Sequence, residues 1–140
     1  MKTPTLEEKI AICEDYTQQW GKFFNFFGDG FEGRKVTGET EAEFFRVMTD
    51  LARKEFRLIY FMEADFKSGD QITEILRSAV SLSNIQGMSE AQFSKFQYEW
   101  HVVFIALNKC LGRLIQQRPV PKAARAVAAK QPQSGPPPSM

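Results

Sequence analysis

The sequence has little of the residue chemistry that most metal and catalytic sites require. Among its 140 residues are two cysteines, Cys13 and Cys110, and one histidine, His101. Two cysteines cannot form a disulfide framework, and no Cys/His cluster has the spacing of a zinc site. A Glu-x-x-His pair, as in di-iron bundles, is also missing, because Tyr98 stands three residues before His101. The sequence therefore predicts no metal site, no cofactor and no catalytic residue.

Long apolar runs are also missing. The longest unbroken aliphatic or aromatic run is the six residues 102–107, whereas a transmembrane helix needs roughly 20. The start of the chain has Lys2, Pro4, Glu7 and Glu8 in place of the apolar segment of a secretory signal. We therefore expect no transmembrane segment and a cytoplasmic location.

Acidic residues are confined to the first part of the chain. Residues 1–100 contain 12 Lys/Arg and 17 Asp/Glu, a net charge of −5, and residues 101–140 contain 6 Lys/Arg and no acid, a net charge of +6. An acidic body repels phosphate groups, so nucleic acid is a possible partner only for the basic end.

Apolar residues recur with helical spacing in four segments. We predict helices at about 5–27, 40–67, 70–86 and 89–118, with threonine or serine capping boxes at Thr5, Thr40 and Ser89. Gly87 is placed to end the third helix with a left-handed cap. The loop before the second helix contains G-x-G-x-x-G at 28–33, but it follows a helix and not a strand, so we do not interpret it as a phosphate site.

These segments predict an all-α protein, an irregular antiparallel four-helix bundle formed by residues 1–118. Residues 119–140 are rich in proline and alanine and contain no aromatic residue. Such a segment cannot build a core, and we predict a disordered basic tail.

The predicted helices differ in length, so we expect one copy of the chain to leave apolar side chains uncovered at its aromatic end and at the end of the last helix. The predicted partner-binding residues are Trp20, Phe23, Phe24, Phe26, Phe27, Phe44, Phe45, Leu111, Leu114 and Ile115. The competing interpretation is that the glycine-rich loop, with Phe31 and Val36, folds back as a lid.

The function that these features favour is a non-catalytic protein-interaction or scaffold subunit. The aromatic end would bind a protein partner or a second copy in a homo-oligomer, and the tail would bind an acidic partner through Arg118, Lys122, Arg125 and Lys130. The alternative is a small carrier that holds a hydrophobic ligand or cofactor between the helices.

Overall fold

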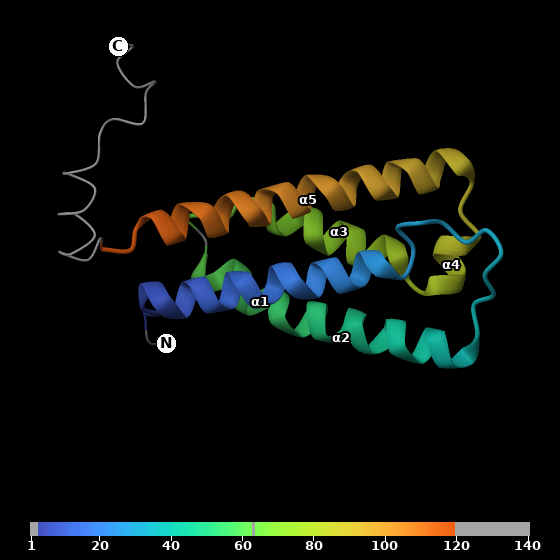
Figure 1. The fold of residues 1–140 in the computed structure, drawn as a ribbon, viewed down its shortest axis with the longest axis horizontal. Helices are drawn as coiled ribbons and strands as arrows, with labels where there is room; N and C mark the ends of the chain where they lie inside the picture. Colours follow the sequence, from blue (N-terminus) through green and yellow to red (C-terminus); the bar gives the residue numbers. More distant parts are fainter. Residues whose placement is uncertain (1–2, 63, 120–140) are drawn as a thin grey trace, which may run out of the picture.

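The computed structural model describes residues 3–62 and 64–119, which form an antiparallel bundle of helices (Figure 1). The helices in this part of the chain are α1 (Leu6–Asn25), α2 (Gly38–Phe61), α3 (Gly69–Ala79), α4 (Leu82–Gln86) and α5 (Glu90–Gln116). Helix α1 packs against α2 and α5, and α3 packs against the same two helices from the other side. The predicted all-α four-helix bundle is confirmed, with α4 as a short addition at one end.

Side-chain caps fix the starts of the long helices. Thr5 forms the predicted capping box with Glu8, and Ser89 forms the predicted box with Gln92. The box predicted at Thr40 is wrong. Helix α2 begins at Gly38, and the hydroxyl of its N-cap Thr37 accepts a hydrogen bond from the backbone N–H of Thr40.

The predicted third helix is interrupted at Val80. This residue has φ 61° and ψ −62°, and the N–H of Ser81 donates to the carbonyl of Ala79 at 2.6 Å, which is a γ-turn. The chain then turns into α4, whose N-cap is Ser81. Gly87 ends α4 with φ −81°, so the predicted left-handed cap is wrong. Helix α2 is also shorter than predicted and ends at Phe61.

Two tryptophans join α1 to α5 at the centre of the core. The indole N–H of Trp20 donates to the carbonyl of Trp100 at 3.1 Å, and the indole N–H of Trp100 donates to the carbonyl of Trp20 at 3.1 Å. Their rings are stacked, with centroids 6.0 Å apart. Each indole N–H reaches its carbonyl only when the two helices have one particular offset along their axes. The pair therefore sets the register between α1 and α5.

The expectation that one copy cannot cover the aromatic end is wrong. Helix α4 lies at this end beyond α3 (Figure 1), and the loop residues Phe31 and Val36 pack against the core. The carboxylate of Glu41 on α2 holds α4 in place, since it accepts from the backbone N–H groups of Leu82 at 2.8 Å and Ser83 at 3.1 Å. The covering elements therefore come from the chain itself, as the lid interpretation proposed.

In residues 3–62 and 64–119, no helix combines the length and apolarity that a membrane span requires. The predicted tail lies outside the described residues from 120 onward.

Candidate functional site

The structure does not bring the ten predicted partner-binding residues into one surface. Five are buried in the core, namely Trp20, Phe23, Phe27, Phe44 and Leu114. Three are partly buried, namely Phe24, Phe26 and Leu111. Two are exposed, Phe45 at 65% and Ile115 at 41%. The buried five are core residues in this structure, and the exposed two lie at different places on the bundle.

His101 is exposed on α5. Its ring lies edge-on against Phe24, with centroids 5.1 Å apart, and against Trp100 at 5.0 Å. The described residues contain no group of three or more His, Cys, Asp or Glu side chains that could hold a metal ion. These contacts give His101 a packing role against the aromatic cluster.

Both cysteines are buried between α1 and α5 and are free thiols. The thiol of Cys13 lies 3.6 Å from the carbonyl of Leu107, one turn before Cys110. Its hydrogen bond with Cys110, followed by burial, raises the pKa of the Cys13 thiol. A thiol with a raised pKa is a poor nucleophile at neutral pH. The same hydrogen bond lowers the pKa of the Cys110 thiol, which is buried in the core.

Arg118, predicted to bind a partner with the tail, is already engaged by the bundle. Its guanidinium donates two hydrogen bonds of 2.8 Å to the carboxylate of Glu7. This bidentate contact lowers the pKa of Glu7 and raises that of Arg118. The other predicted tail residues, Lys122, Arg125 and Lys130, lie outside the described residues.

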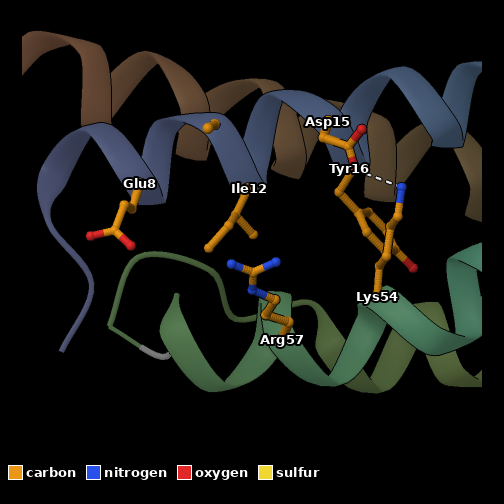
Figure 2. A pocket seen from close by; sticks show the side chains of 7 residues that line it. Glu8, Ile12, Asp15, Tyr16, Lys54 and Arg57 are labelled. Carbon is orange, nitrogen blue, oxygen red and sulfur yellow. Dashed lines mark hydrogen bonds and ion pairs between the residues drawn. The ribbon is translucent and has the colours of Figure 1, made fainter. Parts of the chain in front are cut away.

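A groove of about 250 Å³ runs between α1 and α2. Figure 2 shows Arg57 reaching from α2 toward Ile12 of α1, with Lys54 paired to Asp15 at 2.9 Å beside it. Tyr16 also lines the groove, but its hydroxyl donates to the carbonyl of Leu51 in the core. Burial and then the charge of Glu55 raise the pKa of Tyr16, so this phenol is not an acid or base near neutral pH.

The groove does not favour the carrier function. Sites for drug-sized ligands usually occupy about 300–1,000 Å³ and enclose most of the ligand. Other hollows on the described surface have volumes of about 370–420 Å³, one of them beside Phe26 and Phe31. The space between α1, α2 and α5 is filled by side chains of the core such as Trp20, Leu51 and Leu107. A hydrophobic ligand would therefore have to displace packed residues.

The strongest surface feature is a second apolar stripe along α2. Phe45, Phe56 and Tyr60 are 65%, 66% and 51% exposed, and the rings of Phe56 and Tyr60 stack with centroids 5.8 Å apart. The stripe continues through smaller side chains at steps of three and four residues. Its members, which we call the α2 seam, are Ala42, Phe45, Thr49, Ala52, Phe56 and Ile59, with Tyr60 beside them.

The α2 seam has the heptad spacing of a helix-packing surface, and it is distinct from the face of α2 that forms the core. The core side of the same helix carries Phe44, Leu51 and Leu58, all buried. With Ala42 as position a, the seam alternates a and d positions through Ile59. Helix α2 therefore presents apolar side chains on two faces, of which the bundle buries one.

The two edges of the α2 seam differ in charge. On one edge, Arg46 and Arg53 are exposed. Arg53 is 4.0 Å from Asp50, while Arg46 makes no ion pair within the described part of the chain. On the opposite edge, Glu55 accepts a hydrogen bond from the Thr73 hydroxyl of α3. Arginines therefore flank the seam on one edge, and the hydrogen-bonded carboxylate of Glu55 lies on the other.

The sequence prediction included Phe45 of the α2 seam but missed Phe56 and Tyr60. A signal for Phe56 exists, because residues 42, 45, 49, 52, 56 and 59 form a heptad series offset from the core series of the same helix. Tyr60 is not in that series but follows Phe56 by four residues, one helical turn. The prediction followed the core series alone.

Comparison of the chain with protein-family models, curated proteins and solved structures found no match to any of them.

Proposed function

We propose that the protein is a non-catalytic interaction subunit that binds a helix of a partner along the α2 seam. The single observation that carries the proposal is the exposure of Phe45, Phe56 and Tyr60 on one face of a helix whose opposite face is already buried. The bundle does not need these aromatic side chains for its own core.

Burial of the exposed aromatic side chains against another surface would lower the free energy of the protein. Each large apolar side chain contributes about 1.5–3 kcal/mol when it moves from water into a packed contact. Contiguous apolar patches on soluble proteins commonly mark sites of interaction. From residue 42 to residue 59 the seam is roughly 26 Å long at ~1.5 Å per residue, which suits a partner helix of about five turns.

The chemistry of the described residues gives no support to a catalytic function. Both thiols are buried in the core, the buried phenol of Tyr16 is held by a backbone carbonyl, and the rim charges Lys54 and Asp15 of the groove neutralise each other. A docking function needs none of these groups to react. Binding of an acidic partner by the tail stays a prediction.

A photo-crosslinking experiment in the source cell tests the function. A benzoylphenylalanine replaces Phe56 in the full chain, where it faces away from the core, and a second variant carries it at Tyr98, which is exposed on α5. We expect ultraviolet light to join the chain to a specific protein at position 56 and not at position 98.

The matched control adds Phe45→Ser to the chain with the label at position 56. Because Phe45 is exposed, this change leaves the fold intact and removes one of the seam aromatics, so the crosslink should weaken severalfold. Absence of a crosslinked protein at position 56, or the same products at 56 and 98, would contradict the proposed function.

A further inference from the structure

The identity of the partner helix can be narrowed from the shape of the α2 seam, and this step rests on the proposed function. The seam is bulky toward both ends, at Phe45 and Phe56, and narrow in the middle, at Thr49 and Ala52. Two helices pack well when large side chains of one helix lie opposite small side chains of the other. The complementary helix is therefore bulky opposite the middle and small opposite Phe45 and Phe56.

Charge adds a second requirement. Arg46 and Arg53 occupy the positions that follow d in successive heptads of the seam, and their edge contains no carboxylate at those positions. Residues at such flanking positions form ion pairs with the partner helix and select partner and orientation. A helix with carboxylates along the facing edge matches this pattern, whereas a basic edge would be repelled.

A second copy of the chain does not satisfy the shape requirement in either orientation. Parallel pairing places each seam residue opposite itself, so Phe45 meets Phe45 of the other copy. When two α2 seams are paired antiparallel with a opposite d along their whole length, Phe45 meets Phe56 of the other copy, and Thr49 meets Ala52. Bulky residues then face bulky ones and small residues face small ones. The same pairing places Arg46 near Arg53 of the other copy, which adds like-charge repulsion.

We propose that the α2 seam binds an amphipathic helix of another protein that has a bulky apolar residue opposite Thr49 and Ala52, small residues opposite Phe45 and Phe56, and carboxylates facing Arg46 and Arg53.

Synthetic helices of about three heptads test this inference with the purified full chain. The first peptide has leucine in the middle layers, alanine in the outer layers and glutamate along one edge. The second replaces these glutamates with lysine, and the third exchanges the leucine and alanine layers. Binding is measured by fluorescence anisotropy, and circular dichroism confirms that the three peptides are equally helical.

We expect the first peptide to bind best. Two exposed ion pairs give a preference of about fivefold over the lysine peptide, and this preference falls as salt is added. Exchange of the layers weakens binding about tenfold or more, because the central leucine loses its site. In the variant Arg46→Glu/Arg53→Glu the preference between glutamate and lysine peptides is reversed, while Phe56→Glu removes binding of both.

Three outcomes overturn the inference. They are equal binding of the glutamate and lysine peptides, equal binding of the exchanged-layer peptide, and no binding of any peptide. A fourth outcome that overturns the inference comes from sedimentation of the purified chain. If the chain is a dimer that Phe56→Glu converts to a monomer, a second copy of the chain occupies the seam. In each of the first three cases, a protein crosslinked at position 56 would still support the docking function. Only the inferred features of the partner helix would then be wrong.

Discussion

Neighbouring phenylalanines on α2 have opposite environments. Phe44 is buried in the bundle, where its ring lies 5.9 Å from that of Phe23, and Phe45 is 65% exposed. One residue along a helix is a rotation of about 100°, so adjacent side chains of identical chemistry belong to a core and to a surface. Aromatic composition by itself does not distinguish these two environments.

The paired tryptophans allow a test at the level of single residues. Trp20→Phe and Trp100→Phe each remove one indole N–H bond across the α1–α5 contact and part of a stacked ring. We expect each variant to lower the free energy of unfolding by about 1–3 kcal/mol. Because the two rings contact each other, the double variant should lose about 1 kcal/mol less than the sum.

Urea unfolding followed by circular dichroism measures the three free energies. Arg118 pairs with Glu7, which lies about 20 Å along α1 from Trp20. Arg118→Ala therefore serves as a control that should add independently to Trp100→Phe. If the losses in the two single tryptophan variants add up to the loss in the double variant, the two side chains are not energetically coupled and the prediction is wrong.

At the scale of elements, the break between α3 and α4 gives the bundle its closed end. A single helix from 69 to 86 would run straight past the aromatic end. The γ-turn at Val80 redirects the chain, and α4 then covers this end and is bound by Glu41. The turn places a β-branched side chain at positive φ, a conformation that costs roughly 1–3 kcal/mol.

Val80→Gly should therefore stabilise the protein. Val80 is 67% exposed, so little burial is lost, and glycine adopts positive φ without steric cost. After the greater entropy of glycine in the unfolded chain is subtracted, we expect a gain of about 1 kcal/mol in the free energy of unfolding. Thermal unfolding measures it.

Val80→Ala is the matched control for this change. It shortens the side chain but keeps a Cβ atom, so most of the strain persists and the gain should be smaller than for glycine. A loss of stability in Val80→Gly would show that the side chain contributes more than the turn costs.

The contact between α2 and α4 depends on pH. Hydrogen bonds from the Ser83 hydroxyl, and from the backbone N–H groups of Leu82 and Ser83, lower the pKa of Glu41 below its ordinary value. A carboxyl whose pKa is lower in the folded state stabilises the protein fully above its unfolded pKa, here about 4.5, and loses that contribution as pH falls through the folded value.

Glu41→Gln is thus expected to lower the free energy of unfolding by roughly 1 kcal/mol at neutral pH, the size of a helix-cap contribution. Below about pH 4 the difference from the unmodified chain should shrink, because protonation removes the charge from the unmodified chain as well. Chemical unfolding at several pH values measures this difference. A difference that stays constant down to pH 2 would contradict a role for the charge of Glu41.

At the scale of the whole molecule, other segments of the chain fill the space that the short helix α3 leaves beside the longer helices. The 11 residues of α3 are far fewer than the 24 of α2 or the 27 of α5. The five residues of α4, together with the loop that carries Phe31 and Val36, fill the remaining space. The unequal lengths therefore do not leave the aromatic end open. Three of the seven exposed large apolar side chains in the described residues, Phe45, Phe56 and Tyr60, lie on the outer side of α2 instead.

The sequence by itself determined the helical class, the bundle and the caps at Thr5 and Ser89, because apolar periodicity and capping are local properties of the chain. It also named Phe45 as a partner-binding residue, which stays a prediction, although the structure shows its side chain exposed. Only the tertiary structure decided that Trp20, Phe23 and Phe27 are covered and that Phe56 is not. That outcome depends on which face of each helix meets its neighbour, and on the turn at Val80 that brings α4 over the aromatic end. Such contacts join residues far apart in the chain, and spacing along one helix does not specify them.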